Sequence, residues 1–208
     1  MVNLESRKTK AERQKPDSYM REVARKLFHA AVMLGTVLAS SLIFQTYGLE
    51  VMKSFLLYLL LLVLLTEWLV IDVGTYLPLY RELERPKERH RMHGSAYCLI
   101  GALLAILFFP IKIAFVATMM VAITDVVTGL VGMRWGKIKI FGPKTLEGTA
   151  CGLILNIAIG LTFMPMQVGL AMAITATIVE AVVNIVDDNL AVPVFAGYAG
   201  MLALRFLM

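Results

Sequence analysis

Long apolar runs recur along the chain, and they limit the folds that are open to it. A run of about 20 apolar residues matches the thickness of a bilayer when it is helical, and a soluble helix is apolar on one face only. The candidate spans are 28–46, 52–72, 94–110, 113–133, 148–165, 168–187 and 190–207. With 59% hydrophobic residues, the sequence predicts an all-α, polytopic membrane helix bundle of about seven transmembrane helices.

Lysine and arginine are divided unevenly between the two sides that these spans imply. The chain before the first span, the loop after the second and the loop after the fourth are rich in both residues. Only Lys53, Lys112 and Arg205 fall on the other side. Because basic residues favour the cytoplasmic side, we predict a cytoplasmic N-terminus and an odd number of spans. The expected location is the cell membrane of a prokaryote or an ER-type membrane.

The first residues differ in character from the rest. Residues 1–17 are polar and basic, and we expect a disordered tail there without a cleavable signal peptide. A helix can begin near Asp17 or Ser18, since either side chain can cap it. The remaining residues, 18–208, are expected to form a single transmembrane domain.

The fourth predicted span contains a carboxylate in otherwise apolar sequence. Asp125 lies about 12 residues from the outer end, or roughly 18 Å along the helix axis. An ionisable residue in a membrane span marks a functional site by default, because its burial is costly unless it is paired. Gly129 and Gly132 share its face. Close helix packing explains such glycines most simply, and the alternative is that a ligand approaches the backbone there.

A basic loop follows this span. Arg134 and Lys137 lie at its start, and the sequence from Lys144 through Thr145 and Glu147 to Gly148 leads into the fifth span. If Thr145 lies near the helix start, backbone N–H groups and the positive helix end face any bound anion. The spacing is not that of a P-loop.

The first span begins with a polar helix face. Glu22, Lys26 and His29 are spaced i, i+4 and i+7, and Arg25 is four residues before His29. A juxtamembrane anchor with snorkelling cations is the simpler explanation. A histidine and a carboxylate beside two cations exceed what anchoring requires, so we also consider a binding site.

The sixth predicted span ends in acidic and amide groups. Glu180, Asn184 and Asp187 are spaced i, i+4 and i+7, which predicts one polar face, and Asp188 and Asn189 follow. Carboxylates beside an amide are hard oxygen donors of the kind that magnesium accepts. By the predicted topology, these acids and the loop cations all reach the cytoplasmic half. That arrangement suits phosphoryl transfer from a cytosolic nucleotide to a lipid.

Four elements, in order, resemble the polyprenol kinase family, which includes dolichol kinase, phytol kinase and CTP-dependent diacylglycerol kinase. The chain more distantly resembles CDP-diacylglycerol synthases. The matching elements are Glu22-x-x-Arg25-Lys26-x-Phe28-His29, Asp125 with Gly132 and Gly136, Lys144-Thr145-Leu146-Glu147-Gly148, and Glu180 with Asp187-Asp188-Asn189 and Pro193. The chain departs from the family pattern at Thr128, where alanine is usual.

The resemblance implies a CTP-dependent lipid-alcohol kinase that uses magnesium. Its acceptor would be a prenol of the dolichol, phytol or geranylgeraniol type, or a diacylglycerol-like lipid. The implied catalytic residues are Asp125, Lys144, Glu180 and Asp187, with Asp125 or Glu180 as the proton acceptor. The implied nucleotide-binding residues are Arg25, Lys26, His29, Gly132, Arg134, Lys137, Thr145, Glu147, Gly148 and Asn189. The implied metal ligands are Asp125, Asp187 and Asp188.

Two other functions remain open. A CTP:phospholipid cytidylyltransferase shares the aspartate–glycine helix and the Lys144–Gly148 loop, whereas the Glu22–His29 element favours the kinase. A proton-coupled transporter would also use intramembrane acids, but an inverted repeat with broken helices is not evident. The expected partners are CTP, a membrane lipid alcohol and the bilayer, without nucleic acid. The sequence leaves a homodimer open.

Overall fold

The computed structural model describes residues 2–75, 92, 94–183 and 186–207. Throughout these residues the regular structure is helical, apart from an isolated bridge between Lys139 and Thr145. The helices are α1 (Val2–Tyr47), α2 (Leu49–Ile71), α4 (Gly94–Phe108), α5 (Ile111–Trp135), α6 (Leu146–Phe163), α7 (Met166–Val182) and α8 (Asp188–Arg205). The predicted all-α class is confirmed.

Several helices have the length and composition of membrane spans. Four are long and apolar enough to cross a bilayer: the Glu22–Tyr47 part of α1, and α2, α5 and α6. Helices α4 and α7 are apolar but shorter. Each predicted span overlaps one helix, so the apolar runs located the elements correctly. The number of crossings and the side of each terminus stay predictions.

Helix α1 begins earlier than expected. It starts at Val2 and not near Asp17 or Ser18, so its backbone includes the segment for which we expected disorder. Seven of residues 2–17 are Glu, Lys or Arg, which are strong helix formers. Local propensity therefore continues the helix beyond the apolar run.

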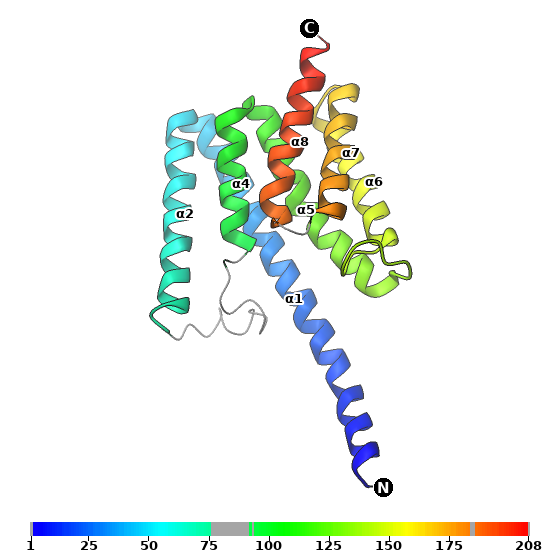
Figure 1. The fold of residues 1–208 in the computed structure, drawn as a ribbon. Coiled ribbons are helices and arrows are strands. Elements are labelled where there is room, and N and C mark those ends of the chain that lie inside the picture. The colour runs from blue at the N-terminus through cyan, green and yellow to red at the C-terminus, as the bar shows by residue number, and fades with distance from the viewer. Residues whose placement is uncertain (1, 76–91, 93, 184–185, 208) are drawn as a thin grey trace.

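Helix α5 lies at the centre of the bundle (Figure 1). It packs against α1, α4, α6, α7 and α8, whereas α2 lies at the edge against α1 and α4. The main core is built around Met120, Val121, Val168, Met172 and Val192, all of which are almost fully buried. The central position of α5 brings its polar residues within reach of several other helices.

Prolines and glycines set the helix ends and the close contacts. Pro110 and Pro165 directly precede α5 and α7, where the missing N–H costs nothing. Gly48, between α1 and α2, has a φ of 86°, which favours glycine. Helices α6 and α7 meet at Gly160 and Gly169, where a Cβ on Gly160 would lie 2.5 Å from the Gly169 carbonyl oxygen. The small residues let these two backbones touch.

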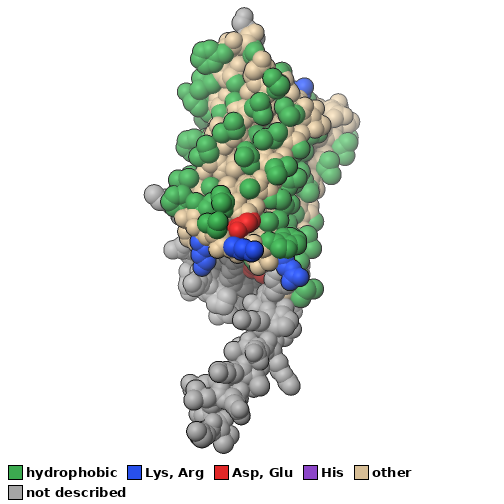
Figure 2. Space-filling view, turned by 90° about the vertical axis from the view of Figure 1, so that its right-hand side faces the viewer, with side chains coloured by type: hydrophobic (Ala, Val, Ile, Leu, Met, Phe, Trp, Pro, Cys, Tyr) green, Lys and Arg blue, Asp and Glu red, His purple; other side chains and the backbone are tan. Residues whose placement is uncertain are grey.

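Charged side chains gather at one end of the bundle. Figure 2 shows an apolar flank with lysine, arginine and acidic side chains at its lower edge. We give the name polar end to five charged residues that contact one another: Lys26, Asp125, Lys144, Glu180 and Asp188. The apolar flank is what a helix bundle presents to lipid, and the polar end is the place to look for chemistry.

Candidate active site

The first link of the polar end joins α1 to α5. The Lys26 ammonium donates to the Asp125 backbone carbonyl oxygen at 3.0 Å and lies 3.3 Å from Oδ1 of the same residue. Both side chains are largely buried, with 12% and 22% exposed. The Lys26 side chain crosses α5 over Gly129, where a Cβ would overlap its terminal atoms. Gly129 therefore makes room for the cation that neutralises Asp125.

The second link joins α5 to α7. The Thr128 hydroxyl donates to Oε1 of Glu180 at 2.5 Å, and Glu180 is buried with 5% exposed. Helix α6 closes this contact from the side, because a Cβ on Gly152 would overlap the Thr128 methyl group. A buried carboxylate needs such a partner, since an unpaired one is costly.

Lys144 provides the third link, from the loop to the junction of α7 and α8. Its ammonium lies 2.5 Å from Oδ2 of Asp188 and also donates to the Glu180 backbone carbonyl oxygen. Carbonyl groups at a helix C-terminus carry partial negative charge and favour cations. One lysine thus binds the end of α7 and the start of α8.

The end of the sixth predicted span differs from our expectation. Helix α7 ends at Val182, and Val183 is extended, so Asp187 does not continue the helical face of Glu180. Asp187 instead caps α8, accepting from the backbone N–H of Asn189 at 3.0 Å and from its side-chain amide at 2.8 Å. Asp187 therefore has its role at the start of α8, because an aspartate before a helix satisfies free N–H groups. Asn184 lies outside the described residues.

Burial affects the charge state of the capping residue. Desolvation, and secondly the negative charge of Asp188, raise the pKa of Asp187 above its ordinary value. The hydrogen bonds from Asn189 oppose this shift. A cation close to Asp187 would favour its ionised form.

His29 joins the site from α1. It lies near Asn189 beside Gly94, and Asp125 is close enough to interact with it electrostatically. Gly94, at the start of α4, faces both, since a Cβ there would lie 3.0 Å from Nδ2 of Asn189 and 3.4 Å from Cε1 of His29. Oδ1 of Asn189 is buried and has no hydrogen-bond partner among the described residues. A buried orphan oxygen is a place where a ligand donor or cation can bind.

The loop between α5 and α6 is held by its own residues. Thr145 lies at the start of α6, the position considered from the sequence, and it caps the helix by accepting from the backbone N–H of Gly148 at 3.3 Å. The Glu147 carboxylate accepts from the backbone N–H of Ile138 at 3.3 Å. In this structure Glu147 therefore positions the loop, and its predicted contact with base or ribose stays a prediction.

The two glycines predicted to bind nucleotide lie between α5 and α6. A Cβ on Gly148 would lie 2.6 Å from the Thr128 carbonyl oxygen, and one on Gly132 would lie 2.9 Å from the Thr145 hydroxyl. Both contacts are helix packing, which for Gly132 is the simpler of the two explanations that the sequence left open. Their predicted role in binding nucleotide stays a prediction.

The other predicted phosphate ligands lie near the surface. Arg134 and Lys137 are exposed, while Arg25 is 2.6 Å from Glu22 on its own helix. The basic loop at 76–91 lies outside the described residues. The structure thus places Lys26 and Lys144 inside the site, whereas Arg134 and Lys137 are exposed.

The proposed metal ligands do not form a ready cluster. In the described part of the chain, no group of three His, Cys, Asp or Glu side chains lies close enough to hold a metal. Asp125 and Asp188 are each paired with a lysine, and Asp187 is engaged by Asn189. The donors still fit magnesium by type, because they are carboxylate oxygens beside the orphan Oδ1 of Asn189. A magnesium site at these aspartates stays a prediction.

Sequence reasoning missed three residues of the site. Thr128, Gly94 and Gly152 all contact the polar groups described above. Gly152 follows Gly148 by four residues, a small-x-x-x-small pattern that predicts close helix contact. Thr128 was visible only as a departure from the family pattern, and Gly94 carried no local signal.

Comparison with known proteins gives two matches. The profile of the Cytidylyltransferase family matches residues 10–188. A relative from Eremothecium gossypii, CTP-dependent diacylglycerol kinase 1, is 26% identical over 140 residues, which cover 65% of this chain and 44% of the relative. The chain thus matches less than half of that relative's length. No solved structure matches the chain. Both matches support the resemblance drawn from the four sequence elements.

Proposed function

Because this chain belongs to the cytidylyltransferase family, we propose that it uses CTP to phosphorylate a membrane lipid alcohol. The relative with the printed activity of a CTP-dependent diacylglycerol kinase supports this choice within the family. The acceptor we propose is a prenol or a diacylglycerol-like lipid at the cytoplasmic leaflet.

The observation that carries the proposal is the pairing of lysines with carboxylates at the polar end. Lys26 contacts Asp125 and Lys144 contacts Asp188, so two cations and two acids converge from α1, α5, the loop and α8. Phosphoryl transfer needs cations for the phosphates and carboxylates for a metal or a proton. An apolar bundle that only spans a membrane has no use for this set.

The proposed reaction assigns a role to each group. The acceptor hydroxyl oxygen attacks the γ-phosphorus of CTP, a new P–O bond forms, and the bond to the leaving CDP breaks. The hydroxyl proton passes to Asp125 or Glu180. Lys144 and Lys26 bind phosphate oxygens, with Arg25, Arg134 and Lys137 around them, and His29 and Asn189 orient the substrates.

We further propose that Asp125, Asp187 and Asp188 hold Mg²⁺. When bound, the ion would neutralise phosphate charge during transfer. In the described structure Lys26 neutralises the charge of Asp125, and Lys144 neutralises that of Asp188.

A pair of labelled nucleotides tests the reaction. Purified protein in lipid nanodiscs is given Mg²⁺, a prenol or diacylglycerol, phosphatidic acid, and CTP labelled on either the γ- or the α-phosphate. The kinase moves only the γ-label to lipid and releases CDP. Lys144→Met should abolish transfer, while Lys112→Met, an exposed lysine at the start of α5, should leave it unchanged. Absence of label from every lipid would refute the proposal.

The alternative is a CTP:phospholipid cytidylyltransferase, which the family match itself favours. That enzyme moves the α-label to phosphatidic acid and releases pyrophosphate. Transfer of the α-label without the γ-label would establish the alternative over the kinase.

A further inference from the structure

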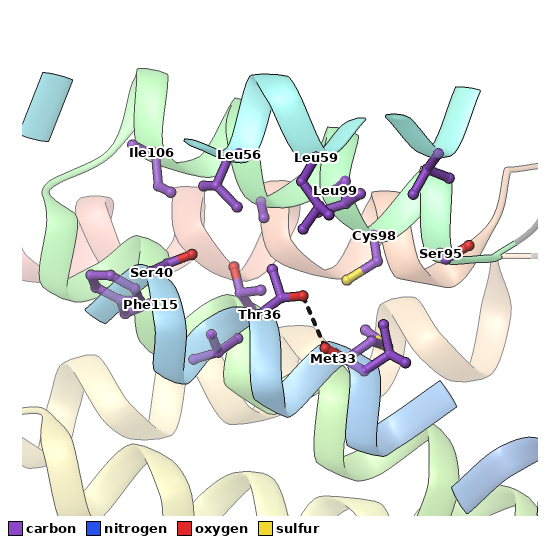
Figure 3. A pocket seen from close by; sticks show the side chains of 15 residues that line it. Met33, Thr36, Ser40, Leu56, Leu59, Ser95, Cys98, Leu99, Ile106 and Phe115 are labelled. Atoms are coloured by element: carbon purple, nitrogen blue, oxygen red, sulfur yellow. Dashed lines mark hydrogen bonds between the residues drawn. The ribbon is translucent and has the colours of Figure 1, made fainter. Parts of the chain in front are cut away.

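An apolar groove runs between α1, α2, α4 and α5. Its wall includes Met33, Thr36 and Ser40 from α1, Leu56 from α2, Ala102 from α4 and Phe115 from α5 (Figure 3). It contains about 570 Å³ of empty space, counted with its open mouth.

Most side chains that line the groove are apolar, and few of its polar groups lack a hydrogen-bond partner. Thr36 donates to the Val32 carbonyl oxygen and Thr118 to the Ala114 carbonyl oxygen, each at 2.9 Å within its own helix. The threonines therefore satisfy their hydroxyl donors locally. Ser40 is the exception: its hydroxyl is buried and has no partner in the described part of the chain.

One end of the groove meets the candidate active site. Ser95 lines the groove and directly follows Gly94, which faces His29 and Asn189. Met33 lies one helical turn beyond His29 on α1. In Figure 3 Ser95 and Met33 lie toward one end, and Ser40, Phe115 and Ile106 toward the other. The groove thus begins next to Gly94, the residue that faces His29 and Asn189.

The other end of the groove reaches a packed cluster. Leu56 and Ile106 are buried there, and Phe115 makes an edge contact with Phe44 at a centroid distance of 6.3 Å. From Ser95 to Ile106 along α4 the distance is about 16 Å at 1.5 Å per residue. This length suits an extended alkyl or prenyl chain.

We propose that this groove binds the hydrocarbon chain of the acceptor lipid alcohol, with the hydroxyl group beside His29 and Asn189. The inference rests on the proposed kinase function. Continuity with the active site, an apolar wall and a position within lipid-exposed helices all favour a hydrocarbon chain. The orphan oxygen of Asn189 supplies an acceptor for the hydroxyl at the inner end.

A substitution that shortens the groove tests the inference. Ala102→Leu places a larger side chain in the wall midway along, and Ala158→Leu makes the same change on the exposed face of α6. Ala102→Leu should raise the KM for long-chain alcohols about tenfold, equivalent to displacing about two methylenes. The KM for CTP and for an alcohol whose chain ends before Ala102 should not change. Equal effects on short and long acceptors, or none, would overturn the inference.

A binding measurement on the unaltered protein separates this inference from the proposed reaction. A long-chain alcohol with a diazirine on its chain is photolysed in nanodiscs without nucleotide, and the labelled peptides are identified by mass spectrometry. Label at groove residues of α1, α2 and α4, competed by unlabelled alcohol, supports the groove even if no phosphate is transferred. Label confined to α6 and α7 would overturn it. A disulfide-linked dimer of the Val32→Cys variant, together with no label in the groove, would also overturn the inference. A second copy of the chain would then fill the groove.

Discussion

The Thr128 hydroxyl and the Glu180 carboxylate, 52 residues apart in sequence, are joined by a hydrogen bond of 2.5 Å between α5 and α7. Glu180 is buried, and its backbone carbonyl oxygen accepts from Lys144. One residue of α7 therefore connects the central helix to the basic loop. Its position depends on a threonine that does not itself carry charge.

We predict that Thr128→Val will lower both stability and activity. Valine keeps the shape and removes the donor, which leaves Oε1 of Glu180 buried without this partner. That loss costs about 1–3 kcal/mol. If one half of it falls on the reaction, kcat drops by about two- to tenfold. Thermal unfolding in detergent and steady-state kinetics measure the two effects, and Thr128→Ser, which keeps the hydroxyl, should restore both.

The Lys26–Asp125 pair predicts that the stability losses caused by substituting each residue alone will not add in the double variant. Lys26→Met leaves Asp125 without its cation and should destabilise the bundle. Removing one partner of a fully buried pair costs about 3–5 kcal/mol, and the loss here should be smaller because both side chains are partly exposed. Asp125→Asn alone should also destabilise it. The double variant should recover most of the loss, because no unpaired charge remains. A double-mutant cycle measured by thermal unfolding checks this, and simple addition of the two losses would contradict it.

The close contact of α5 with α6 predicts different outcomes for two glycines. A Cβ on Gly148 would lie 2.6 Å from the Thr128 carbonyl oxygen, so Gly148→Ala requires the backbone to move. We expect a loss of about 1–3 kcal/mol, typical of overpacking. Gly35→Ala is the control, since nothing lies within 4 Å of that site and alanine favours the helix by about 0.5–1 kcal/mol. Equal unfolding temperatures for the two variants would count against the contact.

The cap of α6 predicts a link between the loop and nucleotide affinity. Thr145→Val removes the oxygen that accepts from the Gly148 backbone N–H, at a cost of about 0.5–2 kcal/mol. Because Lys144 is the adjacent residue, the loop should hold its cation less well and the KM for CTP should rise. Thr145→Ser retains the cap and should retain the affinity. An unchanged KM in Thr145→Val would separate the cap from nucleotide binding.

The sequence located the helices and several site residues by local physical signals. The apolar runs predicted the helices because membrane thickness fixes their length. Asp125 stood out because a charge in such a run is costly. Thr145 was placed near a helix start from the sequence, and the structure adds that its side chain caps that helix.

Other features depend on contacts that no local pattern records. Asp187 was expected on the face of Glu180, but α7 ends at Val182 and Asp187 caps the next helix. The contact of Thr128 with Glu180 depends on how α5 and α7 cross. The same holds for the approach of Gly94 to His29. Spacing along the chain predicts neighbours within a helix and leaves those between helices open.

Charge balance couples the binding of CTP to the binding of a divalent cation in the proposed site. Lys26 and Lys144 already serve as counter-ions for Asp125 and Asp188. If CTP phosphates draw both lysines to themselves, two largely buried carboxylates lose their compensation, which is costly in an apolar bundle. A divalent cation that arrives with the nucleotide restores the balance. Lys26 and Lys144 therefore neutralise the carboxylates until CTP and the divalent cation arrive. Binding of CTP and the cation together is then more favourable than binding of either alone.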